Sequence, residues 1–202
     1  MKTFGQLLRR DIHPFIALMV SSVLLVGMLG LMIVGRAAIL RDGVEVIVRT
    51  APVDPRDLMR GDYVQLRYED ISSVDGSLFA GKMPAQEGLV ALWLTLVAGD
   101  DGVSTVKAIS FEKPDTGEPG EVYLKSKPFR WTKSEMDGIA NRRLSLQFGI
   151  ERYYVPEGEG LAIEDARNQR RTTVALRISA DGEAQIVRLM IDGKPLYEEP
   201  LY

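Results

Sequence analysis

The chain has 202 residues, which is enough for one domain of ordinary size and a membrane anchor. Its residues are 46% hydrophobic and 26% charged, which excludes an intrinsically disordered chain, and the absence of cysteine excludes disulfides and thiolate metal sites. The first 42 residues carry five Lys/Arg and two Asp/Glu, a net charge of +3. Because the whole chain has a net charge of −3, residues 43–202 have a net charge of −6. An acidic domain without a basic stripe argues against nucleic-acid binding, and we expect no nucleic-acid partner.

Residues 15–34 form an uninterrupted apolar run without a charged residue. As a helix, 20 residues extend about 30 Å, the thickness of the hydrocarbon core of a bilayer. The run is too long for a cleaved signal peptide and indicates an uncleaved signal anchor. Lys2, Arg9 and Arg10 precede it, so the positive-inside bias predicts a cytoplasmic N-terminus in the inner membrane.

These observations divide the chain into three segments. We predict a cytoplasmic N-terminal segment over residues 1–14 and a transmembrane helix over residues 15–36 that contacts the lipid bilayer. A single periplasmic or extracellular β-rich domain is expected over residues 43–202.

Short β-rich stretches separated by turns make up the rest of the chain. Alternating or apolar patterns predict strands over residues 44–49, 63–68, 89–98, 103–109, 121–125, 129–131, 143–148, 172–178, 184–191 and 195–197. Asp-Gly turns predict hairpins, residues 71–86 are expected to be a loop, and residues 161–168 to be one short helix. The predicted fold is mostly β, an antiparallel barrel or sandwich with one short helix after the transmembrane helix.

A charge-rich turn and an alternating strand occupy residues 54–68. Asp54-Pro55 starts the turn and Gly61-Asp62 gives a second bend before the chain extends. Along the strand, one face is expected to be buried and to hold Val64, Leu66 and Tyr68, and the other to hold Tyr63, Gln65 and Arg67. We expect the Tyr68 hydroxyl to find a hydrogen-bond partner in the core.

The residues Gly61, Asp62, Tyr63, Leu66 and Tyr68 spell the motif G-D-Y-x-x-L-x-Y. The chain resembles the bacterial GDYXXLXY family in this motif, in its single apolar N-terminal segment and in a later Tyr-Val-Pro-Glu-Gly stretch. The resemblance implies a polytopic membrane protein as partner, and it brings no catalytic residue.

Two segments contain candidate binding residues. Asp54, Asp57 and Asp62 lie within nine residues, but their spacing does not match a calcium loop, so we predict no metal site. The segment from Glu151 to Tyr154 mixes charge with aromatic area, a composition typical of interface hot spots, although a structural corner remains the alternative for both segments. The candidate binding residues are Asp54, Asp57, Gly61, Asp62, Tyr63, Glu151, Arg152 and Tyr153.

No set of residues predicts catalysis. The single histidine, His13, precedes the membrane segment, which excludes a Ser-His-Asp triad from the domain. Pro55 and Gly61-Asp62 have nearly the spacing found in signal-peptidase-like barrels, but the serine nucleophile of those barrels is missing here. Lys107 is a conceivable general base, but it has no serine to activate. We therefore predict no catalytic residue, no cofactor and a non-enzymatic domain that assembles with another envelope protein. The alternative is an envelope hydrolase or small-ligand-binding protein that uses the Asp54–Tyr68 loop.

Overall fold

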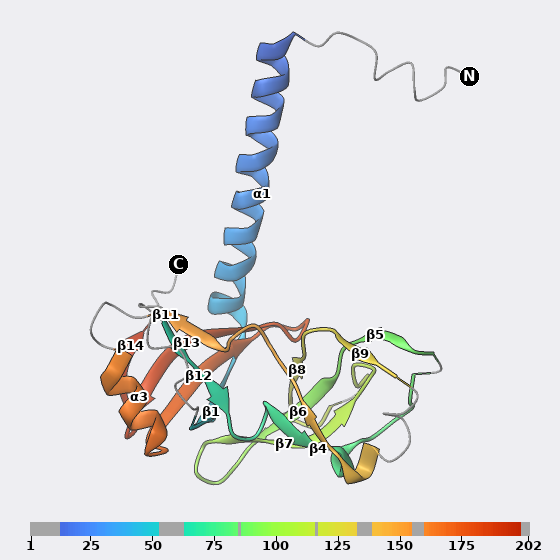
Figure 1. The fold of residues 1–202 in the computed structure, drawn as a ribbon, viewed down its shortest axis with the longest axis vertical. Helices are drawn as coiled ribbons and strands as arrows, with labels where there is room; N and C mark the ends of the chain where they lie inside the picture. Colours follow the sequence, from blue (N-terminus) through green and yellow to red (C-terminus); the bar gives the residue numbers. More distant parts are fainter. Residues whose placement is uncertain are drawn as a thin grey trace. The chain divides into compact units, whose positions relative to one another are not determined.

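The computed structural model describes residues 13–52, 63–84, 86–115, 117–132, 139–154 and 160–198 (Figure 1). The chain divides into two compact units, Met1–Ala38 and Ile39–Tyr202. Most of helix α1 lies in the first unit, and all the strands lie in the second.

Helix α1 spans Pro14–Asp42 and has 29 residues. Its side chains are exposed along the apolar run, and an 18-residue window within it has a mean hydropathy of 2.5. Such a helix is long and apolar enough to cross a membrane once. It is the one helix of this kind among the residues that the structure describes.

The larger sheet of the second unit has five antiparallel strands in the order β14-β13-β12-β1-β3. Its strands are β1 (Val44–Ala51), β3 (Arg67–Tyr68), β12 (Thr172–Ile178), β13 (Ala184–Ile191) and β14 (Lys194–Glu198). Between β13 and β14, Asp192 and Gly193 both have positive φ, 52° and 74°, as a two-residue hairpin turn of type I′ requires. The bounds predicted for β12 and β13 are confirmed.

A second sheet has the order β7-β6-β8, with β6 (Trp93–Ala98), β7 (Ser104–Ser110) and β8 (Val122–Lys125). Three consecutive residues of β6, Leu94 to Leu96, are buried, because both faces of this central strand are covered. The strand predicted over residues 89–98 is divided, however. Its first part belongs to β5 (Gly88–Val90), which pairs with β9 (Phe129–Trp131) and leaves Leu89 79% exposed.

The loop expected over residues 71–86 contains regular structure. Strand β4 (Ser73–Asp75) pairs with β10 (Arg143–Ser145). A single 3₁₀ turn, η2 (Gly76–Leu78), follows β4, and another, η3 (Ile139–Asn141), precedes β10. The two turns touch so closely that a Cβ at Gly76 would lie 1.7 Å from the carbonyl oxygen of Ile139. This approach requires glycine, which the sequence pattern had suggested only as a loop residue.

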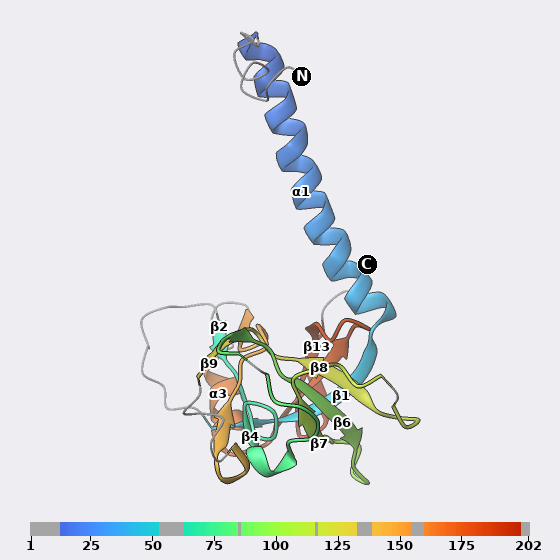
Figure 2. The same ribbon diagram turned by 90° about the vertical axis from the view of Figure 1, so that its right-hand side faces the viewer.

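One contiguous hydrophobic core joins the two larger sheets. It includes Val48 and Val174 from the five-stranded sheet and Leu94 and Leu124 from the three-stranded sheet. Helix α3 (Gly160–Asn168) packs against β1, β12 and the short strand β2 (Tyr63–Gln65), and Figure 2 shows it beside β2. Two sheets that share a core form a sandwich, and the strands that the structure describes do not close into a barrel. The sandwich is therefore the correct one of the two predicted architectures.

Candidate functional site

The two segments with candidate binding residues meet in one antiparallel ladder. Strand β2 (Tyr63–Gln65) pairs with β11 (Arg152–Tyr154), so that Gln65 lies opposite Arg152 and Tyr63 opposite Tyr154. Tyr63 and Arg152 therefore lie in the same ladder, two register positions apart, although nearly 90 residues separate them in the sequence.

The strand predicted over residues 63–68 is interrupted at Leu66. The amide of Leu66 donates to the carbonyl of Glu151 at 2.8 Å, and the chain then leaves β11 and pairs with β1 as β3. The interruption arises because this segment changes its pairing partner, a long-range event that the local alternation of side chains does not encode.

The inner face of this segment is buried, as predicted. Val64, Leu66 and Tyr68 are each 1% exposed. The Tyr68 hydroxyl donates to the carbonyl of Ile150 at 2.6 Å, which confirms that it has a partner in the core. Burial, with a smaller contribution from the charge of Glu151, raises the pKa of Tyr68 well above its ordinary value, so the phenol remains a donor.

Arg167 of α3 holds β2 in place through a hydrogen bond to its main chain. The side chain is 1% exposed, and Nη1 donates to the carbonyl of Gln65 at 2.5 Å. Burial lowers the pKa of Arg167, and nearby Glu164 partly opposes this effect. Arg167 was not among the residues predicted from the sequence, but its position four residues after Ile163 was a signal, because such residues share a helix face and Ile163 is fully buried.

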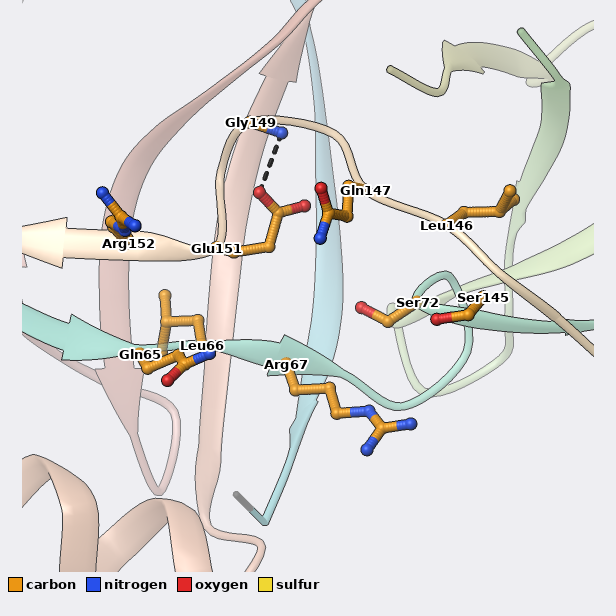
Figure 3. Close-up of a pocket in the computed structure, with 10 residues that line it drawn as sticks. All are labelled: Gln65, Leu66, Arg67, Ser72, Ser145, Leu146, Gln147, Gly149, Glu151 and Arg152. Carbon is orange, nitrogen blue, oxygen red and sulfur yellow. Dashed lines mark hydrogen bonds between the residues drawn. The ribbon is translucent and has the colours of Figure 1, made fainter. Parts of the chain in front are cut away.

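Glu151 closes the turn that leads into β11. One carboxylate oxygen accepts a hydrogen bond from the amide of Phe148 at 2.5 Å, and the other accepts one from the amide of Gly149 at 2.9 Å, the bond drawn in Figure 3. Tyr153 is 3% exposed and faces the core opposite Val64. Glu151 and Tyr153 thus have structural contacts, and Arg152 reaches the solvent-exposed surface.

An open pocket of about 530 Å³ lies beside this ladder; we call it the motif pocket. Figure 3 shows Gln65, Leu66 and Arg67 along the segment that runs from β2 into β3, and Glu151 and Arg152 at the start of β11 beside it. The lining residues are Gln65, Leu66, Arg67, Ser72, Ser145, Leu146, Gln147, Gly149, Glu151 and Arg152.

Several lining residues had not been selected from the sequence. Gln65 and Arg67 alternate with buried residues within residues 63–68. Ser145 and Gln147 alternate in the same way with Leu144, Leu146 and Phe148. For both pairs the sequence therefore carried a signal that they lie on an exposed face. Ser72 had none, because it enters the site through the amide of Leu146, which donates to its carbonyl at 3.0 Å.

Four of the candidate residues, Asp54, Asp57, Gly61 and Asp62, lie outside the described residues, and of Tyr63 only the backbone is described. Their roles stay predictions. Within the ranges that the structure does describe, no three His, Asp or Glu side chains are grouped so as to hold a metal ion.

Lys107 is unsuited to act as a base. Its Nζ donates to Glu118 at 2.7 Å and to Glu121 at 2.8 Å. These two hydrogen bonds, of which the one to Glu118 has the larger effect, raise the pKa of Lys107 above its ordinary value and keep the amine protonated.

The model of a protein family described as GDYXXLXY protein matches residues 25–189 of the chain. That range begins inside α1 and ends inside β13, so it includes both strands of the β2–β11 ladder. Comparison with the curated proteins gives no match, and comparison with the solved structures gives none either.

Proposed function

Because the chain belongs to the GDYXXLXY family, we propose that it is a membrane-anchored, non-enzymatic protein whose extracytoplasmic domain binds another envelope protein. The observation that carries the proposal is the β2–β11 pairing. It brings the motif strand and the segment before Tyr-Val-Pro-Glu-Gly onto one surface. Two separate sequence features that converge on one pocket are expected of a recognition site.

The anchor in this proposal is α1. With three basic residues before the apolar run, the N-terminus lies in the cytoplasm, and residues 43–202 lie outside the inner membrane. Alkaline phosphatase, which is active only after export, is therefore expected to be active when fused behind Tyr202. An inactive fusion retained in the cytoplasm would refute this orientation.

The binding surface is the exposed side of the ladder. Gln65, Arg67 and Arg152 are exposed there, and Tyr154 beside them is 69% exposed. Arginine and tyrosine are among the residues that contribute most to binding energy at protein interfaces. The buried members of the same strands maintain the fold, whereas these side chains reach the surface.

The untested candidates extend this surface. Asp54, Asp57, Gly61, Asp62 and Tyr63 precede the exposed residues in the chain, and we include them in the proposed site. Glu151 and Tyr153 belong to it as residues that hold Arg152 in place, through the turn at Gly149 and the core contact of Tyr153.

Small-ligand binding is the second candidate function, and the motif pocket is the observation that favours it. Its volume of about 530 Å³ falls within the range of small-molecule sites. A site of this kind would bind its ligand without a stable protein partner.

A photo-reactive residue in place of Gln147 tests the proposal in native membranes. Gln147 is exposed and lines the motif pocket, whereas Lys82, also exposed, lies outside it and supplies the control position. We expect a defined adduct with one membrane protein from position 147 and none from position 82. Adducts of equal yield from both positions, or from neither, would contradict assembly through this surface.

A further inference from the structure

We infer that the motif pocket recognises an acidic peptide segment of the partner, whose carboxylates are bound by the arginines that line the pocket. This inference rests on the proposed function and specifies the chemistry of the contact. It is derived from the charges, the hydrogen-bond donors and the size of the pocket.

Among the residues of the pocket lining that the structure describes, the two arginines outnumber the carboxylate. Arg67 and Arg152 are exposed residues of its lining. Lys127 lies against its wall, because a Cβ at Gly149 would be 2.7 Å from Cε of Lys127 and 3.3 Å from its Nζ. The single carboxylate of the lining, Glu151, already accepts two main-chain hydrogen bonds, so its oxygens are directed toward the turn at Gly149.

This local excess of positive charge contrasts with the rest of the domain. Residues 43–202 hold a net charge of −6, so an acidic ligand is repelled by the average surface. A cationic pocket on an acidic domain therefore selects where an acidic segment docks. Such complementarity contributes to specificity and to the rate of association, and salt weakens it.

The neutral lining groups also favour a ligand rich in acceptors. Ser145 and Gln147 are exposed, and a hydroxyl and a side-chain amide each offer hydrogen donors. The Ser72 oxygen accepts the amide of Tyr68 at 3.0 Å, which leaves its hydroxyl hydrogen to donate elsewhere. Together with the guanidinium groups, these donors match carboxylate and peptide carbonyl oxygens.

The size of the pocket favours a peptide over a single anion. About 530 Å³ is many times the volume of roughly 30 Å³ that one water molecule occupies in the liquid, and a free carboxylate or phosphate ion would leave most of it empty. The pocket is open, and exposed Tyr154 continues its surface beyond Arg152. A chain segment of several residues fits such a site.

Fluorescence anisotropy on the full-length chain in detergent tests this inference. The probe is a fluorescein-labelled peptide of eight alternating Glu and Ser residues, and the reference peptides replace Glu with Lys or with Gly. We expect the Glu peptide to bind and the Lys and Gly peptides not to bind. The affinity of the Glu peptide should fall as the salt concentration is raised. Arg67→Glu and Arg152→Glu are each expected to weaken binding by about tenfold or more. Arg130→Glu, which reverses an exposed arginine on β9 outside the motif pocket, is the matched control and should leave binding unchanged.

Other outcomes would overturn the acidic-peptide inference. These are equal binding of the Gly peptide, an equal loss in Arg130→Glu, or displacement of the probe by inorganic phosphate at lower concentrations than by unlabelled Glu peptide. Arg67→Gln and Arg152→Gln, which remove charge without reversing it, replace any reversal variant that fails to fold. These two variants are also expected to weaken binding of the Glu peptide.

The photo-adduct at position 147 separates this inference from the proposed function. If the adduct persists in Arg67→Glu and Arg152→Glu, partner binding stands and recognition of an acidic segment is wrong. If the adduct never forms in the wild-type background, the proposed function itself is wrong, whatever the peptide does.

Discussion

The five-stranded sheet and the motif region, which we define as residues 63–68 and 145–154, share β3 but differ in how much of their hydrogen bonding comes from side chains. In the sheet, β1, β12 and β13 are seven or eight residues long and pair through long main-chain ladders, with one register shift between Ala175 and Leu176 in the β12–β13 pair. In the motif region, β2, β3 and β11 have only two or three residues each. There, side chains donate to or accept from the main chain at Tyr68, Glu151 and Arg167.

The difference explains why one region has a motif and the other does not. Any sequence with strand periodicity supplies the amides and carbonyls of a ladder, so many sequences can form the long strands. A side chain that must reach one particular carbonyl has to be one residue type. Tyr68 is structural through its hydroxyl and Leu66 through its burial in the core, so these two named letters of the motif maintain the fold, and the exposed positions between and beside them are available to a partner.

The largest expected effect comes from the buried leucine of the motif. Leu66→Ala removes packing in the core and should lower the free energy of unfolding by about 2–5 kcal/mol. Leu89→Ala is the matched control, since Leu89 is 79% exposed, and its effect should lie within about 0.5 kcal/mol. Denaturant titration of the full-length chain in detergent measures both. Equal losses would show that Leu66 is not a core residue.

Arg167 offers the next largest effect, because it joins α3 to the motif strand. Arg167→Met keeps the apolar stem but leaves the carbonyl of Gln65 without its charged donor, and should cost about 1.5–3 kcal/mol. Arg167→Lys retains a positive charge without the planar guanidinium and should lose part of that amount. If the methionine variant is as stable as the wild type, the hydrogen bond from Arg167 to Gln65 does not stabilise the fold.

A smaller loss is expected at the tyrosine that closes the motif. Tyr68→Phe leaves the buried carbonyl of Ile150 without its partner, at a cost of about 1–3 kcal/mol in the free energy of unfolding. In the control, Tyr123→Phe, the lost hydrogen bond joins a hydroxyl to Glu121 near the surface, and the change should be smaller. Thermal melts of the two variants under the same conditions decide the order.

The smallest effect depends on pH and concerns Asp70, just after the motif. Burial raises its pKa, as do Glu69 and Asp101, while Arg49 opposes them. The folded state thus keeps this proton to a higher pH than the unfolded state, and stability falls as pH rises above about 4. Asp70→Asn should therefore be more stable than the wild type at pH 7 and equal to it in acid.

Asp75→Asn supplies the opposite sign for comparison. The amide of Ser77 donates to Asp75 and lowers its pKa, so the wild-type carboxylate stabilises the fold at neutral pH and the contribution is lost in acid. This variant should be less stable than the wild type at pH 7. Parallel behaviour of the two asparagine variants would contradict both assignments.

The sequence could predict what depends on local pattern. The strands over residues 172–178 and 184–191 and the helix ending at Asn168 follow from periodicity and turn residues, and so does the burial of Val64, Leu66 and Tyr68. The meeting of Gln65 with Arg152 could not be predicted in this way, because it is set by the packing of distant segments. The partner of Arg167, a main-chain carbonyl, likewise has no signature in the sequence.

The central claim, that the two distant segments form one site, can be tested by a disulfide between them. The bond from Leu66 to Glu151 makes the next pair, Gln65 and Arg152, a non-hydrogen-bonded pair, in which Cα atoms lie about 4.5 Å apart and a disulfide fits. The chain has no cysteine, so Gln65→Cys with Arg152→Cys gives an unambiguous product. Under mild oxidation of the folded full-length chain, we expect a complete intramolecular disulfide that raises the melting temperature, and none in the control pair Lys82→Cys with Arg152→Cys. A cross-link that forms only after denaturation, or equally in both pairs, would contradict the claim.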